Sequence, residues 1–424
     1  MVTLGIVGAG IGGCSAAYFA HKHLANSKVT VYEAENRIGG RTFTYYGPKT
    51  QKELGAEFFN FSNKIVSGLV AELGLQTKKL DGLMDIAVWD GNEFVFQFGQ
   101  SLFHKMFGLV SKHKLSVPKL LFSIKKAEWN IKKLYKEQKK GPVEFSSLFE
   151  GAGLDEWYKT AFDEILLERG IDQSFIDELV TPSTRLIYCQ NADLGGFAGL
   201  VAIMGIYSQD INKIKDGNET FPQKLVEVSG AKVELETKVD AVESLSDGSF
   251  RVFANETSSV YDAVIVASPL EVANISFDGI SLQNQLREYQ TIYARIMRGQ
   301  INPGYFNLDS SKVPSLVLTT KDANPLVLFS IKHLPDKGES LVTVTSLEPL
   351  GDSFVDEFFK KGETVFDHSW SAAYPVFKPI QKVPDMVLDD NLFYLNGIES
   401  AASSLETSAF AAQNSVQALK ESLG

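Results

Sequence analysis

The glycine-rich segment near the start of the chain constrains the fold more than any other feature. The apolar run 3–7 leads directly into GAGIGG at 8–13, and the alanine-rich apolar stretch 15–20 follows. A second apolar run, 28–32, ends in Glu33, twenty residues after the last glycine of the motif. A strand, a glycine turn, a helix and an acidic residue closing the next strand predict a Rossmann-type βαβ unit.

The motif residues have distinct mechanical roles in binding a dinucleotide. Gly8 is expected to make the tight turn, Gly10 to let the backbone approach a pyrophosphate, and Gly13 to let the helix pack closely on the strand. The N–H groups at the helix start bind phosphate. Glu33 is expected to bind ribose hydroxyls, and its charge disfavours the 2′-phosphate of NADP. The predicted contacts are Gly8, Gly10, Ile11, Gly12, Gly13, Glu33 and Ala34.

A second glycine pair and a following loop indicate which dinucleotide is bound. The segments RIGGR at 37–41 and LGAEF at 54–58 resemble the FAD-dependent amine oxidase superfamily. A glycine pair permits close backbone approach, and arginine is a bidentate partner of phosphate, although a solvent turn with an incidental arginine is the alternative. The resemblance implies contacts from Gly39, Gly40, Arg41, Gly55, Ala56, Glu57 and Phe58.

The end of the chain repeats a strand, a glycine loop and a helix. The run 391–395 precedes Gly397, and a helix rich in small residues is expected at 404–412. In the superfamily this loop covers the ribityl chain, and the helix start points N–H groups at flavin N1 and O2, where negative charge collects on reduction. The expected contacts are Val239, Ala267, Gly397, Ile398, Glu399, Leu405 and the Glu406 N–H. No cysteine follows Gly397, so FAD is expected to be non-covalent.

These segments predict an α/β protein: a discontinuous Rossmann-type FAD-binding domain of the glutathione reductase and amine oxidase type, with an inserted α+β substrate domain. The expected FAD domain comprises 1–80, 215–272 and 385–424. The expected substrate domain comprises 81–214 and 273–384.

The segment 100–140 differs in composition from the rest of the chain. It carries eleven lysines and two glutamates, whereas the whole chain has a net charge of −11. Apolar residues alternate with these lysines, which predicts one or two basic amphipathic helices. Peripheral contact of Lys105 to Lys140 with an anionic membrane is one interpretation. A lysine-coated surface helix packed on the substrate domain is the other.

Composition excludes several classes of protein. The acidic balance argues against a nucleic-acid partner, and the two cysteines, Cys14 and Cys189, cannot build a disulfide framework or a four-cysteine zinc site. No metal site is expected. The longest apolar stretches are far shorter than the roughly 18 residues of a membrane-spanning helix.

Several further segments resemble the prenylcysteine oxidase family. They are IGG at 11–13, TPSTRLIYCQ at 181–190, ASPL at 267–270, NISF at 274–277, AYP at 373–375 and LNGIESAA at 395–402. The resemblance implies an FAD-dependent thioether oxidase that converts S-farnesyl- or S-geranylgeranyl-cysteine to cysteine, a prenyl aldehyde and hydrogen peroxide, with O2 as the electron acceptor.

The residues agree with this chemistry. Only one dinucleotide fingerprint is present, so no site for NAD(P)H is expected and the organic substrate must supply the electrons. A C–H beside both sulfur and an alkene is a good hydride donor, so transfer from prenyl C1 to flavin N5 needs no strong base. We therefore assign no catalytic side chain, and we expect the protein to position the substrate in a dry apolar cavity.

The candidate substrate residues lie in two of these segments. Arg185 is expected either to pair with the cysteine carboxylate or to form a salt bridge between domains. Aromatic residues are expected to flank the flavin and the prenyl chain, with ordinary core packing as the alternative. The candidates are Arg185, Tyr188, Gln190, Trp370, Tyr374 and Phe377.

Two other functions remain open. An amine or polyamine oxidase would use the same flavin chemistry, with Trp370 and Tyr374 as an aromatic cage for a cation. A catalytically silent FAD protein would act as a lipid-binding or interaction module.

The compartment also remains open. The family is typically lysosomal or endomembrane, which requires that a leader was trimmed, and the alternative is a cytoplasmic protein. Sequons at Asn60, Asn218, Asn255 and Asn274 permit a glycoprotein.

Overall fold

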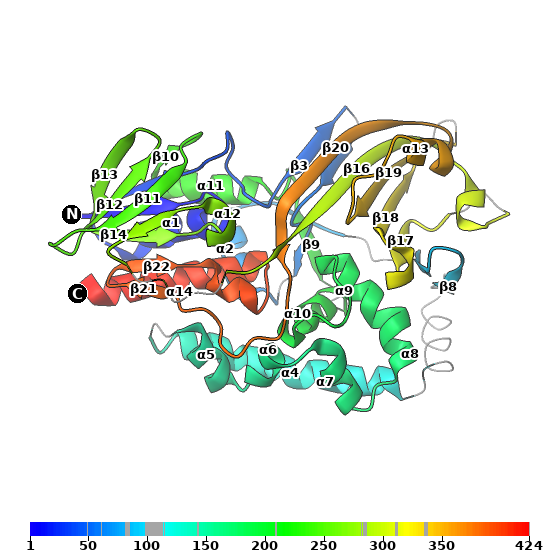
Figure 1. Ribbon diagram of the computed structural model, residues 1–424, viewed down its shortest axis with the longest axis horizontal. Helices are drawn as coiled ribbons and strands as arrows, with labels where there is room; N and C mark the ends of the chain where they lie inside the picture. The colour runs from blue at the N-terminus through cyan, green and yellow to red at the C-terminus, as the bar shows by residue number, and fades with distance from the viewer. Residues whose placement is uncertain are drawn as a thin grey trace.

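The computed structural model describes residues 1–48, 50–60, 62–80, 85–97, 113, 115–141, 144–207, 210–280, 282, 286–309, 313–334 and 338–423. Both termini lie in an α/β part on one side of the molecule, and a large twisted sheet and a layer of helices form the other side (Figure 1). The fold class expected from the sequence is confirmed.

A six-stranded sheet forms the centre of the α/β part. Its order is β10-β2-β1-β14-β22-β21, with only the edge strand β21 antiparallel to its neighbour. The strands are β1 (Val2–Val7), β2 (Ser27–Tyr32), β10 (Lys232–Glu234), β14 (Ala263–Val266), β21 (Val387–Asp389) and β22 (Leu392–Tyr394). The central strands β1 and β14 consist mainly of apolar residues, which suits strands covered on both faces.

Helices cover one face of this sheet, and a small second sheet covers the other. Leu4 and Ile6 pack towards α1 (Ile11–His23), α11 (Thr220–Ser229) and α14 (Leu405–Leu423). Val7 and Val264 pack on the second sheet. Its strands, in the order β13-β12-β11-β15, are β11 (Val239–Ser244), β12 (Phe250–Ala254), β13 (Thr257–Tyr261) and β15 (Ser276–Asp278).

A seven-stranded, mainly antiparallel sheet extends away from the α/β part. Its order is β20 (Phe359–Pro375), β16 (Tyr289–Ile301), β19 (Ser340–Ser346), β18 (Leu326–His333), β17 (Leu316–Thr319), β7 (Ile86–Trp89) and β8 (Phe94–Gln97). Side chains alternate between its faces. Phe329 and Val344 point into an aromatic core with Phe358, whereas Leu328 and Thr343 line a cavity on the other face.

A helical layer lies below the large sheet (Figure 1). It contains α4 (Ser116–Gln138), α5 (Phe145–Ala152), α6 (Asp155–Lys159), α7 (Phe162–Glu168), α8 (Gln173–Phe175), a π-helical turn (Ile176–Val180), α9 (Thr181–Tyr188) and α10 (Gly196–Tyr207). Leu200 and Ile203 of α10 are buried because neighbouring helices surround this apolar helix.

Short elements connect these parts. They are β3 (Thr44–Gly47), β4 (Thr50–Glu53), β5 (Phe59–Asn60), α2 (Lys64–Glu72), β6 (Thr77–Lys79), β9 (Ile211–Ile214), α12 (Leu270–Ala273), α13 (Ser353–Phe358) and 3-10 turns at Pro303–Phe306, Lys321–Ala323 and Asn396–Ser400. β3 and β4 form a hairpin, and β9 lies between β5 and β6.

The expected basic helix corresponds to α4. Lys105, Lys112 and Lys114 of the same segment lie outside the described residues. No helix in the described ranges is long and apolar enough to cross a bilayer. The described residues also contain no group of three His, Cys, Asp or Glu side chains placed to bind a metal ion.

Candidate functional site

A cavity of about 390 Å³ lies where the carboxyl ends of the Rossmann strands meet the large sheet. Gly8 follows β1, Glu33 follows β2, and Ala267 follows β14; all three line this first cavity. The carboxyl ends of parallel strands are where open α/β sheets bind ligands.

The glycine turn brings three backbone segments into close contact. Gly8 has a φ of +103°, and a Cβ there would lie 3.1 Å from the Ala267 carbonyl oxygen. A Cβ on Gly40, whose φ is +54°, would lie 3.1 Å from the Gly10 Cα. A backbone bridge joins Gly10 to Gly39. The result is a cradle with no side chains, which a pyrophosphate can approach closely.

Glu33 is held in place at the end of β2. Its Oε2 accepts a hydrogen bond from the Ala9 N–H at 2.8 Å, and its Oε1 accepts one from the Glu35 N–H at 2.9 Å. The carboxylate is thus fixed at the cavity wall beside the glycine turn, where the dinucleotide fingerprint places the ribose-binding acid.

The structure brings most of the predicted cofactor residues to the first cavity. Those that line it are Gly8, Gly10, Ile11, Gly12, Glu33, Gly39, Gly40, Arg41, Gly55, Ala56, Glu57, Ala267, Ile398, Glu399 and Leu405.

Six predicted contacts do not line the first cavity: Phe58 and Glu406, which line a second cavity described below, and Gly13, Ala34, Val239 and Gly397. Gly13 instead allows helix packing, because a Cβ there would lie 1.9 Å from the Gly8 oxygen. Val239 is buried between the two sheets of the α/β part. Ala34 is exposed, and Gly397 packs against Pro384.

Arg41 forms a buried ion pair that the sequence did not reveal. Its guanidinium bonds Glu399, which is 1% exposed, and also donates to the Ala373 carbonyl at 3.2 Å. Tyr289 donates to Glu399 Oε2 at 2.9 Å, and Asn396 donates to Oε1 at 3.0 Å. Burial alone raises the pKa of Glu399, but the Arg41 charge outweighs it, so this pKa is lowered. Both charged groups line the cavity, so Arg41 can also face a pyrophosphate.

The opposite wall of the first cavity belongs to the large sheet and to α9. Trp370 and Tyr374 of β20 line this wall, and Trp370 Nε1 donates to the Leu54 carbonyl at 2.6 Å. Other residues of the wall are Leu186, Ile187, Cys189, Ile292, Ala294, Leu328, Ser330, Thr343 and Thr345. Burial raises the pKa of Cys189 to about 12, so this thiol stays protonated at neutral pH.

A second cavity, of about 230 Å³, shares a wall with the first. Both are lined by Gly55, Ala56, Glu57, Leu186, Ile187, Tyr374, Ile398, Ser403, Ser404 and Leu405. The remaining wall of the second cavity is mainly apolar and contains Phe58, Phe59, Ile131, Leu134, Phe149, Phe197, Val201, Met204 and Phe410. Phe58, which we expected at the flavin edge, belongs to this second cavity.

Glu406 connects three helices beside the second cavity through hydrogen bonds. Its carboxylate accepts hydrogen bonds from the Ile65 and Val66 N–H groups at 2.9 and 2.8 Å, and from the Tyr135 hydroxyl at 2.5 Å. Burial raises its pKa despite these bonds. The side chain therefore joins α14 to the start of α2 and to α4.

The predicted substrate residues divide into two groups. Trp370 and Tyr374 line the first cavity, and Tyr188 and Tyr374 line the second. The rings of Tyr188 and Tyr374 meet edge to face with centroids 5.1 Å apart. The Tyr188 hydroxyl donates to the Ser403 carbonyl at 3.0 Å.

Arg185 lines neither cavity, which argues against its expected pairing with a substrate carboxylate. Its guanidinium donates to Thr319 Oγ1, the Leu326 carbonyl and Asn191 Oδ1 at 2.7–3.2 Å. Burial lowers its pKa to about 10. These acceptors are neutral, so Arg185 joins α9 to β17 and β18 by hydrogen bonds instead of a salt bridge.

Gln190 and Phe377 also lie outside both cavities. Gln190 donates to the Pro375 carbonyl and accepts from the Phe377 N–H, both at 2.9 Å. The Phe377 ring packs on Tyr188 with centroids 4.8 Å apart. These two residues fix the segment after β20 against the end of α9, and so support Tyr374 indirectly.

Lys52 was missed by the sequence reasoning. It lies on β4 and lines the first cavity, with Nζ 2.8 Å from Ser330 Oγ and 3.6 Å from a Glu57 carboxylate oxygen. The only sequence signal was its position two residues before the LGAEF segment.

These residues fit FAD. The glycine cradle leaves little room for side chains at Gly8 and Gly40, and Glu33 suits a ribose. The start of α1 lines the same cavity. At the far end of the cavity, the start of α14 at Leu405 supplies a second helix N-terminus, which favours negative charge.

The buried ion pair predicts a pH-dependent loss of stability in Glu399→Gln. At pH 7 this variant leaves the Arg41 charge without its counterion, so we expect a loss of about 3–5 kcal/mol in the free energy of unfolding. The pKa of Glu399 is lower in the folded protein than in the unfolded chain. Its contribution to the free energy of unfolding is therefore complete above the pKa of the unfolded chain, and it disappears as the pH falls through the pKa of the folded protein. The difference from wild type should therefore shrink below about pH 4 in urea titrations.

Glu288→Gln is the matched control, because Glu288 pairs with Lys378 at the surface. Its effect should stay within about 1 kcal/mol. Equal stability of wild type and Glu399→Gln at pH 7 would contradict the assignment.

Comparison with known proteins points to the family that the sequence segments resemble. The prenylcysteine lyase family model matches residues 100–422, and an NAD(P)-binding Rossmann-like domain model matches residues 6–73. Farnesylcysteine lyase of Arabidopsis thaliana is 29% identical, over 97% of this chain and 87% of that protein. Prenylcysteine oxidase 1 of Homo sapiens is 26% identical over the same shares.

Solved structures with the same fold include amine oxidases. Cyclohexylamine oxidase from Brevibacterium oxydans IH-35A has a TM-score of 0.68 at 17% identity, covering 100% of this chain and 99% of that one. Wild-type putrescine oxidase bound to putrescine has a TM-score of 0.66 at 14% identity, covering 99% and 98%. At these identities the likeness concerns the fold alone. The match of the family model over residues 100–422 shows that the chain belongs to the prenylcysteine lyase family.

Proposed function

We propose that this protein is an FAD-dependent oxidase that cleaves the thioether of S-prenylcysteine. The observation that carries the proposal is the second cavity, whose apolar wall adjoins the cofactor cavity through ten shared residues. An isoprenoid chain is a long apolar group, and a preformed apolar cavity is suited to bury it. The names of the relatives, farnesylcysteine lyase and prenylcysteine oxidase, point to the same substrate class.

The overall reaction balances without a protein nucleophile. Thioether, O2 and water give thiol, aldehyde and hydrogen peroxide. When bound, FAD supplies the two-electron oxidation at prenyl C1, next to sulfur. Water then adds to the oxidised carbon, and the resulting hemithioacetal releases cysteine and the prenyl aldehyde.

The side chains contribute positioning and exclusion of water. Phe197, Val201 and Met204 form part of the apolar wall that receives the prenyl chain. Tyr374 lines both cavities, so it lies where the chain and the reacting end of the substrate meet. A dry, shaped site of this kind holds the reacting carbon in place and protects the oxidised product from side reactions.

Trp370 distinguishes this function from an amine oxidase. The Arg37 guanidinium already lies 5.8 Å from its ring centroid, and its Nε1 is bonded to the Leu54 carbonyl. A second cation at this ring would be repelled by Arg37, so Trp370 is poorly suited to an aromatic cage. The geometry therefore favours the thioether substrate.

The direct test is product analysis with the purified FAD-loaded protein. We expect S-farnesylcysteine to yield cysteine thiol, farnesal and hydrogen peroxide in equal amounts, and putrescine or cyclohexylamine to yield no peroxide. Oxidation of the amines without the thioether would show that the amine oxidase alternative is correct. Oxidation of neither would support the silent FAD protein.

Gly205→Leu tests whether the prenyl chain occupies the second cavity. Gly205 lines this cavity near the end of α10, and a Cβ there would contact only Phe58, at 3.8 Å. Leucine also has the higher helix propensity, so the variant should fold. We expect kcat/KM to fall at least about tenfold for the farnesyl and geranylgeranyl substrates, and less for the ten-carbon geranyl substrate, because the added side chain fills the cavity.

Gly68→Leu is the control, because Gly68 is an exposed position of α2 with nothing within 4 Å of an added Cβ. It should behave like wild type towards every chain length. An unchanged chain-length preference in Gly205→Leu would place the prenyl chain elsewhere.

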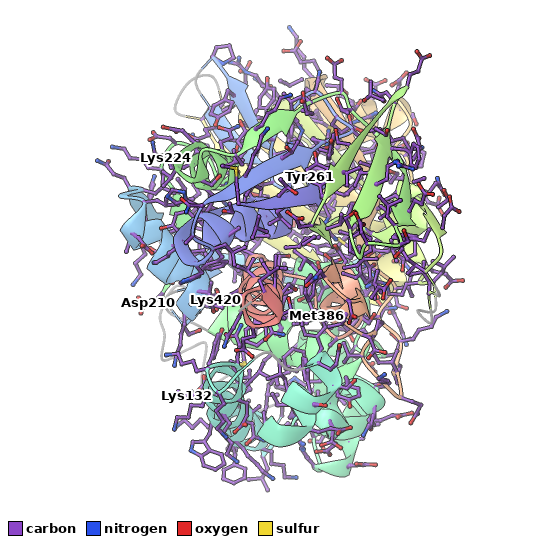
Figure 2. The ribbon with its side chains drawn as sticks, turned by 90° about the vertical axis from the view of Figure 1, so that its left-hand side faces the viewer. Lys132, Asp210, Lys224, Tyr261, Met386 and Lys420 are labelled. Carbon is purple, nitrogen blue, oxygen red and sulfur yellow. The ribbon has the colours of Figure 1, made fainter. Side chains whose placement is uncertain are left out.

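We also propose that the outer face of α4 contacts an anionic membrane. Leu115, Phe122 and Trp129, spaced by seven residues, are 65%, 73% and 60% exposed on one side of the helix. Lys125, Lys126, Lys132 and Lys136 are exposed nearby. Lys132 projects from the helical layer at the edge of the molecule (Figure 2). Exposed aromatic residues flanked by lysines are typical of helices that lie in the membrane interface.

The inner face of the same helix supports this proposal. Ile131, Leu134 and Tyr135 line the second cavity. A membrane bound to the outer face would therefore lie beside the wall that receives the prenyl chain.

Vesicle flotation tests the membrane contact. Wild type should float with vesicles containing phosphatidylserine and stay behind with phosphatidylcholine alone, and binding should weaken with salt. A variant with Lys125, Lys126, Lys132 and Lys133 all changed to Gln should lose binding. Lys224→Gln, on α11 at a separate place (Figure 2), should not. Equal flotation of the quadruple variant and wild type would contradict the proposal.

The compartment stays a prediction, either lysosomal or endomembrane, or cytoplasmic. The structure reduces the candidate glycosylation sites from four to two. Asn60 and Asn218 are 8% and 1% exposed, and Asn218 bonds the Ala56 and Glu57 carbonyls, so folded protein cannot present them. Asn255 and Asn274 are exposed.

A further inference from the structure

The first cavity contains a second pair of opposite charges, Lys52 and Glu57, in addition to Arg41 and Glu399. Lys52 projects from β4, with its side chain 20% exposed, and the Glu57 side chain is 47% exposed. Their closest nitrogen and oxygen atoms are 3.6 Å apart, too far for a hydrogen bond. Among the described residues, Ser330 Oγ is the one hydrogen-bond partner of Lys52 Nζ, so two of the three ammonium hydrogens remain available.

The other charged groups of this cavity are held by protein partners, and Arg41 and Glu33 are also assigned to the cofactor. Arg41 pairs with Glu399, and Glu33 accepts the Ala9 N–H. Glu53 accepts hydrogen bonds from Thr44 Oγ1 at 2.7 Å and the Asn218 N–H at 3.3 Å, and burial raises its pKa. Lys52 and Glu57 are therefore the charged pair with capacity left for a ligand.

The position of the pair matches an amphipathic substrate. Lys52 lines the first cavity, while Glu57 belongs to the wall shared by both cavities. S-Prenylcysteine has a zwitterionic head close to its sulfur and a long apolar chain beyond it. The site has the same sequence of features as the substrate: a charged pair at the shared wall, followed by an apolar cavity.

We infer that Lys52 binds the carboxylate and Glu57 the ammonium group of the cysteine head. This inference rests on the proposed function and names the residues that recognise its substrate. Arg185, for which the sequence left pairing with the carboxylate open, lines neither cavity and donates to Thr319, Leu326 and Asn191 instead, and Lys52 takes that role. A lysine ammonium and a carboxylate form a charge-assisted hydrogen bond, and the same holds for a carboxylate and an α-ammonium group.

This pair also explains selection against simple amines. An amine substrate has no carboxylate to neutralise Lys52, so its cation would approach a positive charge. An α-amino acid satisfies both charges at once. A simple amine pairs with Glu57 but leaves Lys52 without a counterion, so the pair disfavours amines relative to α-amino acids.

The test assays each variant with the complete substrate and with an analogue that lacks one charged group. Wild type, Lys52→Met and Lys52→Arg are assayed with S-farnesylcysteine and with S-farnesylcysteamine, which lacks the carboxylate. Lys52→Met should raise KM for S-farnesylcysteine about 10- to 100-fold, the range expected for one charge-assisted hydrogen bond, with a much smaller change in kcat. It should not raise KM for S-farnesylcysteamine, which has no carboxylate to lose, and Lys52→Arg should restore most of the binding of S-farnesylcysteine.

The second arm of the test concerns Glu57. Glu57→Gln should raise KM for S-farnesylcysteine and leave N-acetyl-S-farnesylcysteine, which has no ammonium group, almost unaffected. Lys28→Met, an exposed lysine at the start of β2, serves as the control and should behave like wild type. Bound FAD, measured by absorbance, should be the same in the Lys52 and Lys28 variants as in wild type, and the kinetics of Glu57→Gln are normalised to bound FAD.

The results distinguish an error in the proposed function from an error in the assignment of Lys52. If wild type oxidises neither thioether, the proposed function is wrong. If wild type oxidises both, and Lys52→Met loses the same factor with S-farnesylcysteine and S-farnesylcysteamine, the function stands and the assignment of Lys52 is overturned.

Discussion

The buried ion pair of Arg41 and Glu399 connects the parts of the chain that form the site. Arg41 follows the second glycine pair, Glu399 lies in the turn before α14, and Tyr289 adds the first residue of β16. Removing such charges from water is costly unless each has a partner, so the pair favours one arrangement of these segments. The Arg41 bond to the Ala373 carbonyl adds β20 to the same cluster. The N-terminal cradle, the C-terminal loop and the large sheet are thereby held around one cavity.

The shared wall between the two cavities explains how one fold can serve a different substrate class. The Rossmann strands and the large sheet have the arrangement found in amine oxidases, as the TM-scores show. In this chain α4, α9 and α10 line an apolar cavity beside the cofactor cavity. The chemistry at a carbon next to a heteroatom is common to both classes, so the change of substrate depends on what surrounds that carbon.

The features that the sequence predicted well are those in which local backbone geometry determines the residue type. Gly8 needs a positive φ, Gly13 has no space for a side chain, and Glu33 closes a strand beside the turn. Each requirement acts within a few residues, or at a spacing fixed by the βαβ unit, and so leaves a readable motif.

The features that the sequence did not predict depend on contacts between distant segments. Arg185 looked like a substrate anchor, but its neighbours on β17 and β18 supply neutral acceptors that satisfy it. The wall of the second cavity combines α4, α10 and the LGAEF segment, which share no motif. Lys52 lies on a short hairpin, and only the packing of β4 against β18 brings it to Ser330. Tertiary packing determines these roles.

The most direct measurement of the central claim is a crystal structure of the FAD-loaded protein with S-farnesylcysteine, prepared without oxygen. We expect the diphosphate of FAD to lie against Gly8, Gly10 and Gly40, and the farnesyl chain to lie among Phe197, Val201 and Met204. A farnesyl chain outside the second cavity, or a dinucleotide away from the glycine cradle, would contradict that claim.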